Sequence, residues 1–255
     1  DFLNHWRKCN LEYLDKIFLG DGIAGMKIYP DNSIDMILCD LPYGMTDCAW
    51  DNALDFGLLW SQYWRILKDN GAVVLTAVQP FTTDVINSCR RFFRYCWYWQ
   101  KNMPTGFAFA KYQPMRCIED VCVFYKKAPT YNPQGIKHLE KPIVTKGKRE
   151  TDGIYKDSTL GRDSLRYVTG YPRNLLRVNC ERGLHPTQKP IALFEYLIRT
   201  YTNAGDTVLD NCMGSGTTAI ACINTGRYYT GFEKDERYYR VAQDRIAERL
   251  KQSST

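Results

Sequence analysis

Histidine is scarce in this sequence, and the cysteines lack the spacing of a metal site. The chain has three histidines, and its ten cysteines are scattered without a C-x-x-C pair. Structural zinc sites draw four ligands from closely spaced cysteines and histidines, so we predict that no metal is bound. Several cysteines lie in apolar stretches, where a free thiol behaves as a small buried hydrophobe: Cys39, Cys122 and Cys222. Free thiols are typical of a reducing compartment, so we expect a cytoplasmic protein.

Long apolar runs are also missing. No stretch reaches the roughly 18 consecutive apolar residues of a membrane helix, and the first residues, DFLNHWRKCN, do not form a charged segment followed by an apolar one. We therefore expect neither a membrane span nor a secretory signal. With 255 residues, 44% of them hydrophobic, the chain is long enough for one large α/β domain with insertions or for two small domains.

The positive charge is modest but unevenly distributed. The formal net charge is +6, and residues 128–182 contain 11 Lys and Arg against 6 Asp and Glu. Such a segment is either an ordinary solvated surface or a surface that faces a polyanion. It is also rich in Gly, Pro and Thr without sustained periodicity, which predicts a long irregular insertion.

Elsewhere, strand patterns alternate with helical patterns. Apolar, partly β-branched runs predict strands at 15–21, 33–40, 71–77, 95–101, 119–127, 207–210 and 227–233. Apolar residues at helical spacing predict helices at 56–67, closing on Gly71, at 82–92, 191–201 and 216–226. A final amphipathic helix is predicted from the apolar stripe Tyr238, Val241, Ala242, Ile246 and Leu250. This alternation predicts a mostly parallel sheet covered by helices on both faces.

The stretch VLDNCMGSGTTAIA has the features of a cofactor-binding turn. A predicted strand brings Asp210 to a turn in which Gly214 and Gly216 let the backbone pass close to a ligand, just before a helix amino terminus. The stretch lacks the G-x-G-x-x-G and G-K-[ST] patterns, and a lone G-x-G also fits a tight strand-to-helix connection. Glu233 ends the next strand, where an acid can accept hydrogen bonds from ribose hydroxyls. Together the two features favour a nucleoside cofactor.

The stretch DLPYG, residues 40–44, follows the predicted strand 33–40. Taken alone it fits a β-turn with Pro42 at the second position. Open α/β sheets bind ligands at the carboxyl ends of strands, where the strand order reverses. If the strands that end in Asp40 and Asp210 are neighbours, DLPY and the cofactor share one crevice.

Four motifs in order, DLPYG, HPTQKP, VLDNCMGSGTT and GFE, resemble those of the S-adenosylmethionine-dependent DNA amino-methyltransferases of the β group. The resemblance implies a circularly permuted, Rossmann-like methyltransferase fold, α/β in class, with a mostly parallel seven-stranded sheet. It also implies three segments. Residues 1–127 form the catalytic half, 128–182 a basic target-recognition insertion, and 183–255 the cofactor-binding half.

By this resemblance, residues Asp40, Leu41, Pro42 and Tyr43 form the catalytic motif. The Asp40 carboxylate and the Leu41 carbonyl accept the N–H bonds of the target amine, and Tyr43 stacks on a base flipped out of the duplex. Leu41 replaces the usual first proline, which is tolerable if only its carbonyl is used. The first position favours adenine, because cytosine enzymes of this family more often begin the motif with serine.

The resemblance also assigns residues to S-adenosylmethionine: Asp21, His185, Thr187, Lys189, Asp210, Gly214, Ser215, Gly216, Thr217 and Glu233. Glu233 is expected on the ribose and Asp21 near the adenine ring, although GDG could equally be a turn. His185, Thr187 and Lys189 are expected at the carboxylate end, although Lys189 could also be an exposed cation.

Two residues depart from the family's cofactor motif. Asn211 and Cys212 replace the usual Pro-Phe, so an aromatic ring expected near the cofactor is missing. The cofactor is still expected to bind, with different packing around the methyl donor.

The expected partner is double-stranded DNA, read by the basic insertion. Its candidate contacts to phosphates or base edges are Lys146, Lys148, Arg149, Arg173 and Arg177. We expect a bacterial or phage-encoded enzyme, with a homodimer by analogy alone and a restriction endonuclease partner left open. The alternatives are the same reaction on cytosine N4, an RNA or protein-amide methyltransferase, and an inactive DNA-binding subunit.

Overall fold

A computed structural model describes residues 12–43, 54–147, 163–181 and 188–253 of the chain. The chain forms two compact units, Asp1–Asn132 with Asn174–Thr255, and Pro133–Arg173. The first unit contains a large sheet with its helices, and the second contains a two-stranded sheet. No helix in the described ranges is both long and apolar enough to cross a bilayer.

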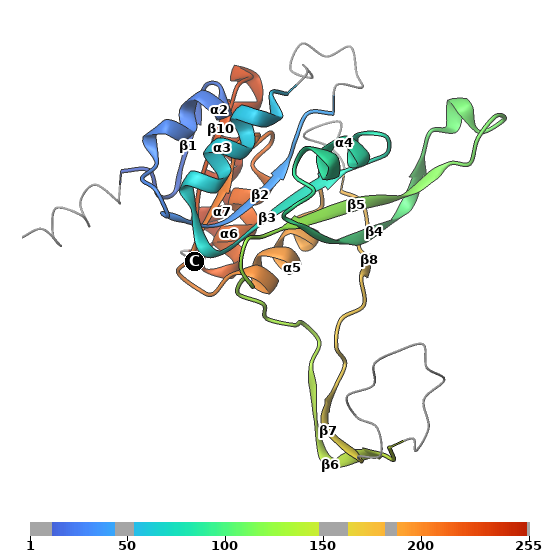
Figure 1. Ribbon diagram of the computed structural model, residues 1–255. Coiled ribbons are helices and arrows are strands. Elements are labelled where there is room, and N and C mark those ends of the chain that lie inside the picture. Colours follow the sequence, from blue (N-terminus) through green and yellow to red (C-terminus); the bar gives the residue numbers. More distant parts are fainter. Residues whose placement is uncertain (1–11, 44–53, 148–162, 182–187, 254–255) are drawn as a thin grey trace, which may run out of the picture. The chain divides into compact units, whose positions relative to one another are not determined.

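The sheet of the first unit has eight strands (Figure 1). Its order is β1 (Lys16–Leu19), β10 (Tyr228–Glu233), β9 (Thr207–Asp210), β2 (Ile34–Asp40), β3 (Leu67–Ala77), β5 (Arg116–Phe124), β4 (Phe93–Thr105) and β8 (Leu175–Arg177). The five strands from β1 to β3 are parallel, and β5 is antiparallel to both of its neighbours. The α/β prediction is confirmed. The sheet has eight strands rather than seven because β8, inside the segment expected to be irregular, pairs with β4.

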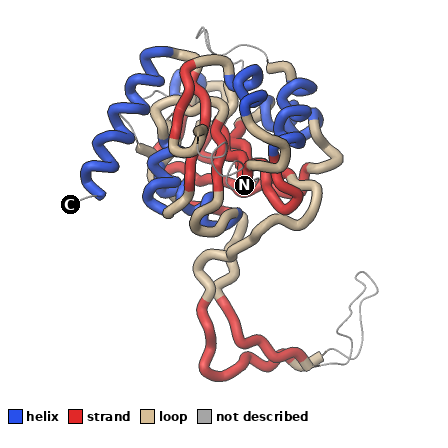
Figure 2. Tube along the Cα trace, turned by 90° about the vertical axis from the view of Figure 1, so that its left-hand side faces the viewer, coloured by secondary structure: helices blue, strands red, loops and turns tan. Residues whose placement is uncertain are grey.

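Helices cover both faces of this sheet, and Figure 2 shows them in blue on either side of the red strands. One face packs against α2 (Gly22–Gly25), the 3-10 turn η1 (Met26–Ile28), α3 (Phe56–Ile66) and α4 (Phe81–Ser88). The other packs against α5 (Ile191–Tyr201), α6 (Thr217–Thr225) and α7 (Glu236–Ser253). Each face has its own core of buried apolar side chains, which explains why the central strands read as continuous apolar runs.

Helix α3 ends earlier than its sequence pattern predicts. It begins at the cap Asp55, whose carboxylate accepts the Leu58 N–H at 3.0 Å, and it ends at Ile66. Strand β3 begins at the next residue, so Gly71 lies inside the strand and does not terminate the helix. A Cβ at Gly71 would come 2.7 Å from the Asp35 carbonyl oxygen, so glycine is needed there for the close approach of two strands.

The strand order reverses between β2 and β9. These strands are neighbours, with Met36 opposite Val208 and Ile37 opposite Leu209. From β2 the chain continues through α3 to β3 on one side, and from β9 it continues through α6 to β10 on the other. The two motif strands are therefore central neighbours, which is the condition for DLPY and the cofactor to share one crevice, and Asp40 and Asp210 end them on either side of a topological switch point.

The second unit consists mainly of β6 (Lys137–Thr145) and β7 (Ser164–Thr169), which pair antiparallel. The sequence predicts irregular structure for this segment, and the paired strands show that this prediction is wrong here. Its register shifts between His138 and Ile143, where Pro142 lacks the N–H that a regular ladder requires. Proline and the many charged residues hide the alternating pattern of a strand.

The eight described cysteines are free thiols. Cys39, Cys122 and Cys222 are buried, as their apolar surroundings predict. Burial raises the pKa of the Cys39 and Cys222 thiols well above its ordinary value. These thiols therefore stay protonated and act as small core side chains.

Candidate active site

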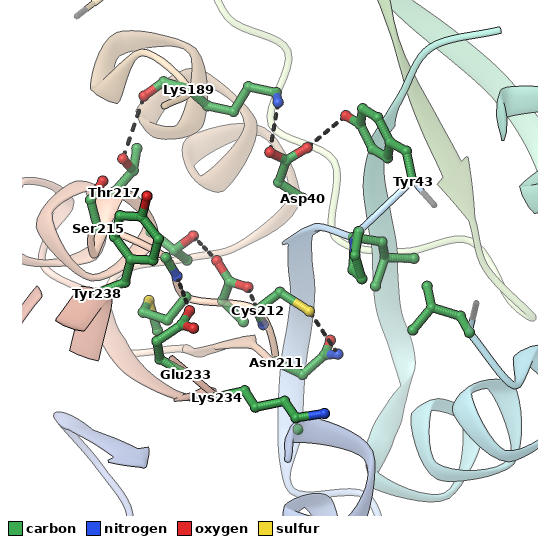
Figure 3. Close-up of a pocket in the computed structure, with 18 of the residues that line it drawn as sticks. Asp40, Tyr43, Lys189, Asn211, Cys212, Ser215, Thr217, Glu233, Lys234 and Tyr238 are labelled. Carbon is green, nitrogen blue, oxygen red and sulfur yellow. Dashed lines mark hydrogen bonds and ion pairs between the residues drawn. The ribbon is translucent and has the colours of Figure 1, made fainter. Parts of the chain in front are cut away.

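A cavity of about 300 Å³ lies in the first unit and is lined by both motifs (Figure 3). The DLPY motif contributes Asp40, Leu41, Pro42 and Tyr43, and the second motif contributes Asp210, Gly214, Ser215 and Thr217. Asp21, Lys189 and Glu233 complete the predicted set that reaches the cavity. His185 and Thr187 lie outside the described residues. Gly216, also assigned to the cofactor, does not line this cavity. The other described residues that the sequence assigns to catalysis and to the cofactor thus share one space.

The Asp40 carboxylate is held by three donors. Its Oδ1 accepts hydrogen bonds from the Tyr43 hydroxyl at 2.7 Å and from the Thr76 hydroxyl. Its Oδ2 accepts one from the Lys189 ammonium at 2.6 Å. A carboxylate offers about four acceptor positions, two on each oxygen. Among the described residues, Oδ2 has a single donor, which leaves it an acceptor position for a substrate N–H.

Lys189 belongs to a row of alternating charges. Its ammonium lies 2.6 Å from Asp40 Oδ2 and 3.6 Å from Glu119 Oε2, and the other oxygen of Glu119 lies 2.9 Å from the Lys101 ammonium. We call Lys101, Glu119, Lys189 and Asp40 the charge row. Two cations alternate with two anions, so the charges of the row sum to zero.

Lys189 is 6% exposed and keeps its charge despite this burial. Burial alone lowers the pKa of the ammonium, but the carboxylates of Asp40 and Glu119 more than offset it, so its pKa lies above the ordinary value. The alternative of an exposed cation is therefore wrong. The sequence places Lys189 near the cofactor's carboxylate end, but its pairing with Asp40 was not expected.

Tyr43 is fixed at both its hydroxyl and its ring. The hydroxyl donates to Asp40, while the ring packs against Phe81 with centroids 5.0 Å apart. The Lys189 ammonium lies 5.7 Å from the centre of the same ring. Burial and the nearby Asp40 raise the pKa of the Tyr43 phenol well above its ordinary value, so it remains a donor. Its stacking on a flipped base stays a prediction.

The side chain of Leu41 belongs to the hydrophobic core. It is almost completely buried in the cluster formed by α3, α4 and the strands beneath them. A residue at this position can therefore change its side chain without changing the polar lining of the cavity. This packing agrees with the expectation that only the backbone of Leu41 takes part in the chemistry.

The glycine turn is shaped by Asp210. The backbone of Gly214 and Gly216 is left-handed, with φ of +55° and +82°. The buried Asp210 accepts the Cys212 N–H at 2.9 Å and the Thr218 hydroxyl, and thus ties the two sides of the turn together. Burial raises the pKa of the Asp210 carboxyl to about 6.

Glu233 closes the cavity at the end of β10. Its Oε2 accepts the Gly214 N–H at 2.6 Å and its Oε1 accepts the Asp235 N–H at 2.8 Å. Burial raises the pKa of this carboxyl above its ordinary value. Asp21 lines the same cavity, and its Oδ1 caps α2 by accepting the Ala24 N–H at 2.9 Å.

Several residues of the site were missed in the sequence. Thr76, the last residue but one of β3, pairs with Asp40. Lys101 and Glu119 lie where the predicted strands 95–101 and 119–127 end and begin. A charged residue at the end of an apolar strand was the available signal. Tyr238 fitted the apolar stripe of the last helix, yet it lines the cavity and brings a ring to the site whose cofactor motif lacks one.

The candidate DNA contacts fall in both units. Arg177 lies in β8 of the first unit, where its Nε donates to Gln100 Oε1 at 3.0 Å. Lys146 and Arg173 are exposed in the second unit, while Lys148 and Arg149 lie outside the described residues. Their contact with DNA stays a prediction.

Comparisons with known proteins identify relatives of this chain. A family model described as DNA methylase matches residues 34–244. The Type II methyltransferase M.HpaI of Haemophilus parainfluenzae is 26% identical over 91% of this chain and 74% of its own length, and M.HinfI of Haemophilus influenzae is 27% identical over 93% and 69%. The crystal structure of the M1.HpyAVI-SAM complex is similar, with a TM-score of 0.60 at 26% identity, over 91% of this chain and 98% of that chain. The cytosine-N4-specific PvuII DNA methyltransferase, at 16% identity and a TM-score of 0.64 over 93% and 91%, shares the fold.

Proposed function

The chain belongs to the DNA methylase family, whose members use S-adenosylmethionine, and from this premise we propose that it methylates the N6 amine of adenine in double-stranded DNA. The observation that carries the proposal is the position of Asp40. Its carboxylate lines the same cavity as the glycine turn and Glu233, so a methyl donor and an acceptor amine can meet there. The acid at the first position of the motif favours adenine.

The residues of the cavity fit S-adenosylmethionine. Glu233 and Asp21 provide carboxylate acceptors for ribose hydroxyls and for an adenine amine, and Ser215 and Thr217 provide hydroxyls close to the start of α6. The ring of Tyr238 adds an apolar surface. When bound, the cofactor supplies an electrophilic methyl group on a positively charged sulfur.

Asp40 prepares the amine for attack. The lone pair of an adenine amine is delocalised into the ring, so the amine is a weak nucleophile. An acceptor aimed at its N–H bonds favours a tetrahedral nitrogen and stabilises the positive charge that develops there. Asp40 is suited to this role because Thr76, Tyr43 and Lys189 fix its orientation before the substrate arrives.

The charge row keeps this acceptor effective. A lone ammonium next to Asp40 would oppose the positive charge that develops on the amine. Glu119 offsets the charge of Lys189, and Lys101 in turn compensates Glu119. The site therefore presents a fixed carboxylate in a neutral cluster, with its charges arranged before the reaction begins.

The test of this function is the identity of the methylated nucleoside. Unmethylated plasmid DNA is incubated with the protein and S-adenosylmethionine labelled on the methyl group, digested to nucleosides and separated. We expect the label in the deoxynucleoside of N6-methyladenine. Label in N4-methylcytosine would establish the alternative substrate, and unlabelled DNA would contradict the proposal.

A further inference from the structure

Strands β4 and β5 form a hairpin that extends beyond the rest of the sheet, drawn in green in Figure 1. Its last pair is Thr105 with Arg116, and we call residues 106–115 together with Arg116 the hairpin tip. The tip contains the short turn η2 (Phe107–Phe109) and is part of the first unit. It lies outside the segment 128–182 that the sequence assigns to DNA recognition.

Three aromatic rings are exposed on this tip. Phe107 is 82% exposed, Phe109 59% and Tyr112 86%. Folding gains free energy by burying such rings, so three of them within six residues on a protruding loop need another explanation. Exposed apolar clusters of this kind mark surfaces that bind a partner.

The charge of the tip indicates which partner it fits. Lys111 and Arg116 are exposed among the aromatic residues, and the sequence has no Asp or Glu from residue 102 to residue 118. Within the described part of the chain, neither cation forms an ion pair. Aromatic rings interleaved with cations suit stacking on bases and contact with phosphates. A second copy of the chain is a poorer occupant, because the cores of protein interfaces are depleted in lysine.

The tip lies on the same edge of the sheet as the active site. In the central strands Asp40 is level with Thr76, and the next residue of β3, Ala77, pairs with Asp120. From Asp120 the chain back to Arg116 runs past the end of β3, by about 13 Å at the usual rise per strand residue. DNA that delivers a base to Asp40 must therefore approach along the edge from which the tip protrudes.

We propose that the hairpin tip binds DNA, with its aromatic rings stacked on or inserted between bases beside the flipped nucleotide and with Lys111 and Arg116 on phosphates. A ring inserted there replaces part of the stacking that the duplex loses when a base leaves it. This inference rests on the proposed function, since it takes DNA as the substrate. It adds a second DNA contact that is independent of the basic segment.

The test compares the full-length protein with a Phe107→Ala/Tyr112→Ala variant. Affinity for a fluorescein-labelled duplex of mixed sequence is measured by anisotropy, and affinity for S-adenosylmethionine by calorimetry. We expect the DNA dissociation constant to rise at least about tenfold, as when stacked rings are lost, and the cofactor affinity to stay unchanged. The matched control is Tyr228→Ala, which removes a ring that is 42% exposed at the opposite end of the parallel strands.

A second variant tests the charges separately. In Lys111→Gln/Arg116→Gln the slope of log affinity against log salt concentration is expected to fall by about one unit for each charge removed, because each charge contacts one phosphate. The control is Lys16→Gln, which removes an exposed cation on β1 and should leave the slope unchanged. Unchanged DNA affinity in both tip variants would overturn the proposal. So would tip variants that change their oligomeric state but keep the DNA affinity of the wild type. If the wild-type protein methylates DNA and the tip variants bind DNA normally, only the role of the hairpin tip is refuted. Wild-type protein that neither binds nor methylates DNA would refute the proposed function as well.

Discussion

The Lys189 ammonium lies 2.6 Å from Oδ2 of Asp40, although the two residues are 149 positions apart in the chain. Asp40 ends the central strand β2, and Lys189 precedes α5 on one face of the sheet. Their pairing joins the DLPY motif to the segment 183–255, which we predict to be the cofactor-binding half. It fixes one oxygen of the carboxylate that we assign to the target amine.

Replacing Lys189 with methionine tests whether this pairing matters for catalysis. We expect kcat to fall about 100-fold, the usual loss when one preorganised polar partner is removed, while cofactor affinity changes little. A kcat close to that of the wild type would contradict this role.

Replacing Glu119 in that background provides the matched control. In Lys189→Met/Glu119→Gln one cation and one anion of the charge row are removed together, so its charges still sum to zero. We expect the double variant to keep the low kcat of Lys189→Met, since Asp40 still lacks its donor. Full recovery of kcat would show that Lys189 serves only to neutralise Glu119.

The effects of replacing Lys101 and Glu119 on the free energy of unfolding should not be additive. Both side chains are largely buried, and removing one partner of a buried pair typically costs about 3 kcal/mol because the other charge is left uncompensated. We therefore expect Lys101→Met to destabilise by that amount, and Lys101→Met/Glu119→Gln by less than the sum of its parts. Urea denaturation of the four proteins measures the coupling, and strictly additive losses would argue against it.

Asp210 should give stability a distinct pH dependence. Burial raises its pKa to about 6, above the unfolded value of about 3.9, so the folded state binds the proton more strongly. The corresponding stability is complete below about pH 4 and is lost as the pH rises through 6, by about 3 kcal/mol. As the pH rises from about 4 to about 6, the free energy of unfolding of the wild type should therefore fall relative to that of Asp210→Asn. A difference independent of pH would refute the shift.

Gly216 and Gly226 form a matched pair at the two ends of α6. Both are left-handed, with φ of +82° and +71°. A Cβ at Gly216 would lie 3.1 Å from that of Ala242, whereas one at Gly226 meets no atom within 4 Å. We expect Gly226→Ala to cost about 1 kcal/mol for the backbone conformation alone, and Gly216→Ala to cost more and also to weaken cofactor binding. If the two substitutions had equal effects on stability and on cofactor binding, the turn around Gly216 would have no special role in the cofactor site.

Much of this fold is predictable from the sequence because its patterns are local. Apolar runs and helical spacing place β2, β9 and α5 within a residue or two. They also place Asp40 and Asp210 at the ends of strands, although that these strands are neighbours is known only from the structure. The charge row is not predictable in this way, because Lys101 and Glu119 lie on strands whose register with the rest of the sheet is set by tertiary packing. Strand β8 was missed for a similar reason, since a three-residue strand carries almost no periodicity.

The most direct test of the central claim replaces Asp40 with alanine and measures methyl transfer and cofactor binding side by side. Because this leaves Lys189 without its closest partner, Asp40→Ala/Lys189→Met is measured with it as a control for folding. We predict that both variants bind S-adenosylmethionine within about threefold of the wild type and lose methyl transfer to DNA by at least a factor of about 1,000. Methyl transfer near the wild-type rate in the double variant, or loss of cofactor binding in both, would contradict the role assigned to Asp40.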